Sequence, residues 1–142
     1  AKAVDKVEQK NPGRSRIFVT MTTAIGPGAG MPTEWSACVD QLAFGLNGLD
    51  PYTQGISWGT DFALKQRLFV MSAGNVPWQG WTQYPDINHS TSIEDPGQSW
   101  NGLTVGACTD LTYLDIQRWP TYALIAQGGA LSPASTTSRL WV

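Results

Sequence analysis

Asn75 is the residue of this chain whose type and setting are best suited to chemistry. It closes the run 67–75 (RLFVMSAGN), in which an apolar stretch passes directly into small residues. The side-chain amide of an asparagine is a neutral donor, and such a donor stabilises an oxyanion that develops in a transition state. Ser72, Ala73 and Gly74 leave room for a ligand beside the backbone. The alternative is a plain turn, because glycine and asparagine both adopt positive φ readily.

An expected strand over Leu68–Met71 would place Asn75 at the edge of a sheet. Continuous apolar runs of this kind are typical of parallel strands buried on both faces, and open α/β sheets bind ligands at the carboxyl ends of their strands. Further strands are expected at Phe18–Thr23, Leu103–Ala107 and Tyr122–Ala126. With a helix between the first two strands, the pattern predicts an α/β fold with a mostly parallel sheet flanked by helices.

The connecting helix is expected to begin after Thr33, which is a favourable N-cap residue. Apolar side chains then recur at helical spacing and predict a face that packs on the sheet: Trp35, Cys38, Val39, Leu42, Ala43 and Leu46. Asn47 or Gly48 is expected to end this helix. Residues 1–10 are expected to form one or two polar helical turns, and residues 50–60 and 78–95 are expected to be loops.

Four segments, taken together, resemble the subtilisin-like serine proteases. Residues 72–75 (SAGN) resemble the oxyanion-hole segment of that family, and residues 100–107 (WNGLTVGA) resemble its strand that ends in Val-Gly-Ala. Residues 128–138 (GGALSPASTTS) are similar to its Leu-Ser-Pro-x-Ser loop, and residues 16–23 (RIFVTMTT) to the strand that leads to a wall of the substrate cleft. Their order and spacing agree with the family, and the resemblance covers residues 16–142.

The resemblance implies a partial subtilisin-like three-layer fold, with residues 1–15 as a polar N-terminal segment and residues 16–142 as the central part of a peptidase domain. It implies that Asn75 donates to the oxyanion of the reaction. It also implies that the substrate-binding residues are Thr22, Thr23, Ala24, Ser72, Ala73 and Gly74. The first three would flank a bound peptide that pairs as an added strand, and the last three would line the pocket for the residue before the scissile bond.

The catalytic triad of that family is not matched by this chain. Such a protease needs a serine nucleophile, a histidine base and an aspartate that orients the histidine. In the family, the aspartate and histidine precede the segment matched by residues 16–23, and the serine follows the Leu-Ser-Pro loop. The single histidine, His89, lies at a position where no triad member belongs. We therefore expect a central fragment that does not hydrolyse peptides alone, and whether the parent is an active enzyme stays open.

Composition agrees with a globular piece of one domain. The chain has 142 residues, of which 42% are hydrophobic and only 14% charged. So little charge indicates a surface that the rest of a domain normally covers. The net charge of −2 and the scattered lysines and arginines give no argument for nucleic acid as a partner. No apolar run approaches the roughly 20 residues of a membrane span, so no membrane partner is expected, and the localisation stays open.

No metal or cofactor is expected. Asp86, His89, Glu94 and Asp95 are close in sequence, but carboxylates in loops are usually solvated, and EF-hand spacing is lacking. The glycine-rich segment 25–30 is not followed by the Lys-Ser/Thr of a nucleotide-binding loop. Cys38 and Cys108 stand alone and are expected to be free and buried.

A second class of function remains open, namely a non-catalytic binding module. It would be either a degenerate subtilase or an aromatic-rich glycan-binding domain, because Trp78, Trp81, Tyr84 and Trp100 could stack on sugar rings. The favoured interpretation is that these aromatic side chains pin a long loop to the core. The expected partner is a peptide or protein substrate of the intact protein, and open sheet edges are expected to favour dimerisation.

Overall fold

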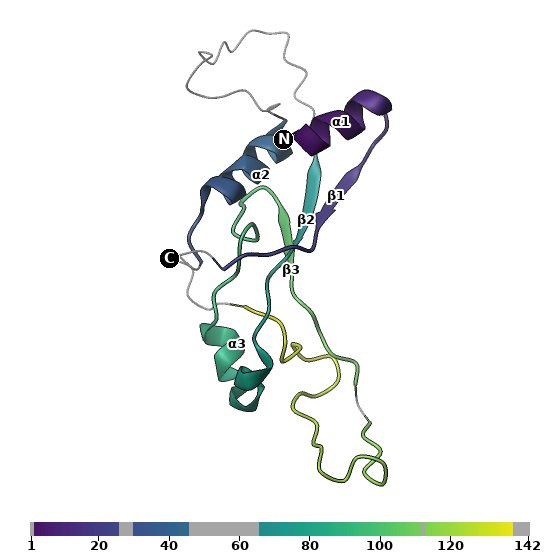
Figure 1. Cartoon of the computed structure of the whole chain (residues 1–142), viewed down its shortest axis with the longest axis vertical. Coiled ribbons are helices and arrows are strands. Elements are labelled where there is room, and N and C mark those ends of the chain that lie inside the picture. The colour runs from purple at the N-terminus through teal and green to yellow at the C-terminus, as the bar shows by residue number, and fades with distance from the viewer. Residues whose placement is uncertain (1, 26–29, 46–65, 112, 138–142) are drawn as a thin grey trace.

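A computed structural model describes residues 2–25, 30–45, 66–111 and 113–137 (Figure 1). The elements in chain order are α1 (Lys2–Lys10), β1 (Ile17–Thr20), α2 (Glu34–Phe44), β2 (Leu68–Ser72), the 3₁₀ helix η1 (Trp78–Gln83), α3 (Asp86–Ser90) and β3 (Leu103–Val105). The strands form one parallel sheet in the order β1-β2-β3. The expected α/β fold with a parallel sheet is therefore confirmed.

The register brings the carboxyl ends of the three strands to one edge of the sheet. Thr20 of β1 pairs with Met71 of β2, and Ser72 of β2 pairs with Val105 of β3. All three strands run in the same direction, so the segment that follows β1 and the segment that follows β2 lie side by side. This edge is where ligands bind in open α/β sheets.

Helix α2 begins where the sequence predicts and ends earlier. The Thr33 hydroxyl oxygen accepts hydrogen bonds from the backbone N–H groups of Trp35 and Ser36, and the Ser36 hydroxyl accepts one from Thr33 N at 2.7 Å. The helix ends at Gly45, whose φ of 106° is left-handed. Gly45 is the first glycine that the helix reaches, so the predicted end at Asn47 or Gly48 was wrong.

Helices α1 and α2 cover one face of the sheet, which we call the covered face (Figure 1). The core there is formed by Val4, Val39, Leu42, Ala43, Phe69 and Met71. Phe18 of β1 stacks on Phe69 of β2 with 5.1 Å between ring centroids. Cys38 is partly buried against the same cluster, whereas Trp35 is exposed, so the predicted packing of Trp35 on the sheet was wrong.

The opposite face of the sheet, which we call the open face, is apolar and exposed. Its side chains are Ile17, Val19, Leu68, Leu103 and Val105, with exposed fractions between 45% and 64%. Burial along β2 therefore alternates, and the prediction that Leu68–Met71 is buried on both faces was wrong. The reason is that both helices packed on the sheet lie on the same side of it.

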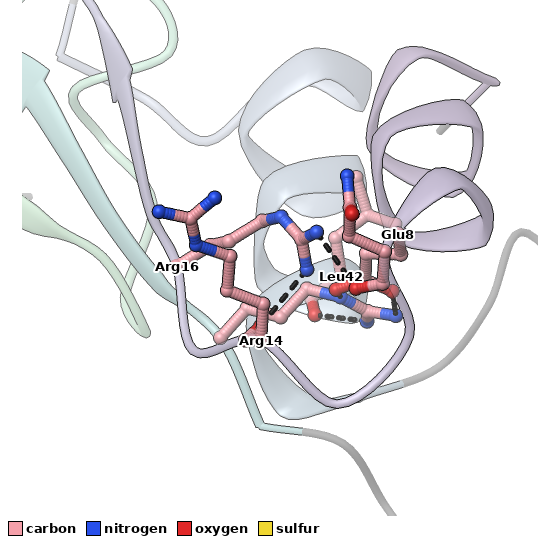
Figure 2. Close-up of polar contacts among 6 residues, drawn as sticks. Glu8, Arg14, Arg16 and Leu42 are labelled. Atoms are coloured by element: carbon pink, nitrogen blue, oxygen red, sulfur yellow. Dashed lines mark hydrogen bonds and ion pairs between the residues drawn. The ribbon is translucent and has the colours of Figure 1, made fainter.

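A buried ion pair fastens α1 to the start of β2. The Arg67 guanidinium donates to both carboxylate oxygens of Glu8, at 2.9 and 2.8 Å, and to the carbonyl of Leu42 at 2.9 Å. Figure 2 shows Glu8 reaching toward α2 at Leu42. The hydrogen bond with Glu8 raises the pKa of Arg67 above its usual value. Arg67 therefore joins three elements as a permanently charged group.

Two sequence predictions are wrong for the segments that surround the sheet. Residues 78–95 contain two short helices, η1 and α3, each preceded by a proline, and these are too short to show a helical period. Residues Tyr122–Ala126 do not form a strand, because no described residue pairs with their backbone as a ladder, and Tyr122, Leu124 and Ile125 are exposed. Residues 50–60 lie outside the described residues.

Residues 110–111 and 113–128 form a projection that we call the arm, drawn in green to yellow below the sheet in Figure 1. Its base is closed by backbone hydrogen bonds from Thr109 N to Ala130 O (2.9 Å) and from Ser132 N to Ala107 O (2.8 Å). Within the arm, the Asp115 side chain accepts hydrogen bonds from the N–H groups of Gln117 and Arg118 and so stabilises a turn. The two ends of the arm are therefore adjacent where they join the rest of the fold.

Candidate functional site

The candidate site lies where the chain leaves β1 and β2. The Ala73 N–H donates to Val105 O at 3.0 Å, which continues the β2–β3 pairing one residue past the strand. Asn75 follows two residues later and is exposed. No described residue hydrogen-bonds its side-chain amide, so the donor that the sequence singled out is free to meet a ligand.

The segment Ser132–Thr136 runs along the backbone that carries Asn75 and holds it. Asn75 and Ser135 form an antiparallel bridge, flanked by hydrogen bonds from Val76 N to Ala134 O (2.8 Å) and from Thr136 N to Gly74 O (3.3 Å). The Thr136 hydroxyl donates to Ala73 O at 2.6 Å. The backbone on both sides of Asn75 is thus held by a segment some sixty residues away in the chain.

Asn88 of α3 anchors that segment from the other side. It is fully buried, and its side-chain NH₂ lies 3.1, 3.0 and 2.7 Å from the carbonyl oxygens of Ser132, Pro133 and Ser135. An amide donor that meets three carbonyls fixes the course of the loop that carries them. Sequence analysis missed this residue, because an asparagine in an aperiodic segment carries no local signal of burial.

Glu94 lies directly over Gly74. A Cβ atom placed on Gly74 would come within 2.7 Å of Glu94 Cγ and Cδ, and the φ of Gly74 is +110°. Only glycine satisfies both conditions. The Glu94 N–H donates to Ala73 O at 3.0 Å, and the Thr23 hydroxyl donates to Glu94 Oε2. Gly74 was expected to leave space for a substrate backbone, and in this structure Glu94 occupies that space.

Ala24, which follows β1, pairs with Asp95 across the site, and Asp95 also contacts the start of α2. Their backbones pair in both directions, each N–H donating to the other's carbonyl at 3.0 Å. The buried Asp95 carboxylate accepts from the Thr33 hydroxyl at 2.6 Å, which ties the N-cap of α2 to the same point. Because both backbone groups of Ala24 are engaged, an added strand would have to pair with its neighbours.

The structure therefore brings six of the seven sequence-derived site residues to one edge of the sheet, within two adjoining segments. These are Thr23, Ala24, Ser72, Ala73, Gly74 and Asn75, linked by the contacts above and by a long hydrogen bond from Ser72 Oγ to Met21 O (3.5 Å). Thr22 lies in the same segment and is exposed. The order β1-β2 alone makes these segments neighbours.

A model of the subtilase family matches residues 3–142. The chain belongs to the subtilase family. No curated protein and no solved structure matches the chain significantly. The family match covers α1 as well as the sheet and the segment Ser132–Thr136, so the arrangement described above is that of a subtilase chain.

The aromatic side chains considered for glycan binding, all among the described residues, do not form one surface. Trp78 and Trp100 are 70% and 78% exposed, so the expectation that they pin a loop to the core was wrong for both. It was right for Trp81, which is half-buried and donates from Nε1 to Val76 O at 3.0 Å. Trp78 follows the carboxyl end of β2 and Trp100 precedes the amino end of β3, so a parallel sheet sets them at opposite ends.

Among the described residues, no three His, Cys, Asp or Glu side chains are grouped so as to hold a metal ion. No helix within the described ranges has the length and apolar character needed to cross a membrane. Cys38 and Cys108 are free thiols, as expected, but Cys108 is exposed rather than buried.

Proposed function

We propose that this chain is the central part of the catalytic domain of a subtilisin-like serine endopeptidase. It contributes Asn75 as the oxyanion donor, together with the strands that flank the substrate. The aspartate, histidine and serine of the triad belong to other parts of a longer protein. The observation that carries the proposal is the exposed, unbonded amide of Asn75 on a backbone held by β3 on one side and by Ser132–Thr136 on the other.

The proposed reaction is acyl transfer to serine followed by hydrolysis. As the serine oxygen attacks the substrate carbonyl carbon, the carbonyl oxygen acquires negative charge. The Asn75 NH₂ donates to that oxygen, and the donor is useful because its position is fixed before the reaction begins. The hydrogen bonds of Ala73, Gly74 and Val76 with the segment Ser132–Thr136 fix the backbone that carries Asn75. Collapse of the intermediate releases the amine, and water then hydrolyses the acyl-enzyme.

The open face supports the proposal that the rest of a domain packs on this chain. Five aliphatic side chains stand exposed there on three adjacent strands. Contiguous exposed apolar surface of this kind marks an interaction surface in soluble proteins. A parallel sheet is also ordinarily covered on both faces.

The test is labelling with a fluorophosphonate serine probe. The longer protein that contains this chain should label with one probe per molecule, and the 142-residue chain alone should not label. Labelling of the chain alone would show that it carries its own nucleophile. A longer protein that folds but does not label would instead be a degenerate subtilase that binds without cleaving.

The matching mutation is Asn75→Ala in the longer protein. In subtilisin, removal of such a donor lowers kcat by about 100- to 1,000-fold, and we carry this magnitude over by family membership. KM should change far less, because the donor acts mainly in the transition state. Steady-state kinetics on a peptide substrate measures both. Gln79→Ala, which removes an exposed amide from η1, is the matched control and should leave kcat unchanged.

A further inference from the structure

Glu94 is the charged group nearest to the segment that carries Asn75. Its side chain is half-buried, and its carboxylate lies against the Cα of Gly74, since a Cβ there would meet Glu94 Oε2 at 2.8 Å. One oxygen, Oε2, accepts from Thr23. The other oxygen accepts no hydrogen bond from the described residues. A carboxylate in this setting retains capacity for a further donor.

The position of Glu94 is set by its backbone. Its N–H donates to Ala73 O at 3.0 Å, and its carbonyl accepts from Gly97 N at 2.8 Å in a tight turn. Gly97 is itself closely packed, because a Cβ at that position would come within 2.9 Å of Glu94 O. The turn therefore places the Glu94 carboxylate between the chain segments that leave β1 and β2. Thr23 from β1 and Gly74 from β2 touch it from the two sides.

No described lysine or arginine balances this charge. The Arg67–Glu8 ion pair lies at the other end of β2. A half-buried carboxylate with a free oxygen can accept a charge-assisted hydrogen bond from a cationic ligand, and such bonds are stronger than neutral ones. Of the residues that contact Glu94, Ala73 and Gly74 are assigned by the family resemblance to the pocket for the residue before the scissile bond, and Thr23 is assigned to the segment that flanks the peptide.

We propose that Glu94 is the specificity-determining residue of this subtilase and selects lysine or arginine immediately before the scissile bond. The inference rests on the proposed function and names its substrate class. The ammonium or guanidinium of that residue donates to the free oxygen of Glu94, while Thr23 holds the other oxygen. Thr23 is in this scheme a positioning residue. Gly74 has no side chain, which allows the carboxylate to lie directly against the backbone of the segment that carries Asn75.

The kinetic test compares two peptides that differ only by arginine or citrulline before the scissile bond, because citrulline has the shape of arginine without its charge. In the longer protein, kcat/KM should favour the arginine peptide by about 10- to 100-fold, as expected for hydrogen bonds to a charged partner. Glu94→Gln should bring the ratio near one. Glu34→Gln, which removes an exposed carboxylate from α2, should leave the ratio as it is.

The binding test does not depend on catalysis. The affinity of the longer protein for butylguanidinium and for neutral butylurea is measured by calorimetry, with wild type, Glu94→Gln and Glu34→Gln. Butylguanidinium should bind at least about tenfold more tightly than butylurea to wild type and Glu34→Gln, and equally weakly to Glu94→Gln. Equal binding of the two compounds to wild type would overturn the inference, even if Glu94→Gln failed to fold.

The two tests separate the inference from the function on which it rests. Cleavage of both peptides at equal rates would leave the protease function standing and remove Glu94 from specificity. Absence of any cleavage or probe labelling would refute the protease function, and the butylguanidinium measurement would then still decide whether Glu94 binds a cation. Preference for citrulline over arginine would overturn the inference outright.

Discussion

The covered and open faces of the sheet carry the same kinds of side chain in opposite surroundings. On the covered face, Met71 is 1% exposed beneath α1 and α2. On the open face, Val19 is 64% exposed, although it pairs with Val70, the residue next to Met71 in β2. The strands are apolar on both faces, but the helices cover only one of them. The described residues therefore form one half of a hydrophobic core.

The largest expected effect is on the ion pair that fastens α1 over the covered face. Glu8→Gln leaves the Arg67 guanidinium, 2% exposed, with a neutral partner. Breaking one side of a buried pair costs about 3 to 5 kcal/mol, and this should appear as a lowered urea midpoint for the 142-residue chain. Because the pair is buried, the loss should persist at high salt. Glu34→Gln is the control, and an equal loss there would assign the effect to net charge.

The next effect compares two methionines. Met71→Ala opens a cavity under the helices and should lower the free energy of unfolding by about 2 to 5 kcal/mol. Met21→Ala removes the same atoms from a side chain that is 84% exposed, so it should change stability by less than about 0.5 kcal/mol. Urea unfolding of both variants measures the difference. Equal losses would mean that the two sides of the sheet are not distinguished in solution.

The smallest effect is expected for a substitution on the open face, made both in the 142-residue chain and in the longer protein. Val19→Thr keeps the shape and the strand propensity of the residue. In the 142-residue chain, where Val19 is exposed, stability should change by less than about 0.5 kcal/mol. In the longer protein we expect a loss of about 1 to 3 kcal/mol, because the hydroxyl would be buried under the rest of the domain. The same small change in both proteins would mean that nothing covers the open face.

Much of the sheet could be predicted from sequence, because its signals are local. The apolar run at Leu68–Met71, the Thr33 cap and the helical spacing of Val39 and Leu42 each act within one element. Residues Tyr122–Ala126 show where this fails: they have strand-like composition, but a strand exists only with a partner, and the arm provides none. The burial of only one sheet face could not be foreseen either, since it depends on which helices pack there.

The candidate site was predicted in part for the same reason. Asn75 and Gly74 belong to one short motif, and the strand order made Thr23 their neighbour. Asn88 was not singled out, and Glu94 was considered only as a metal ligand. Their roles come from contacts with residues far away in the chain, and no pattern within residues 78–95 points to those contacts. Glu94 lies where a Cβ on Gly74 would be, a contact that no local pattern predicts, and the role of Gly74 in binding substrate stays a prediction.

Because the base of the arm is closed by hydrogen bonds, the length of the arm can change without changing the geometry of the site. Residues 107–109 and 129–132 are paired directly, and the segment that holds Asn75 follows at once. Anything that replaces residues 110–128 and keeps this pairing meets the fold at two adjacent points, where the added closure entropy grows only slowly with length. The arm is therefore a natural site for grafting a reporter or a second domain onto the protein without moving the cleft.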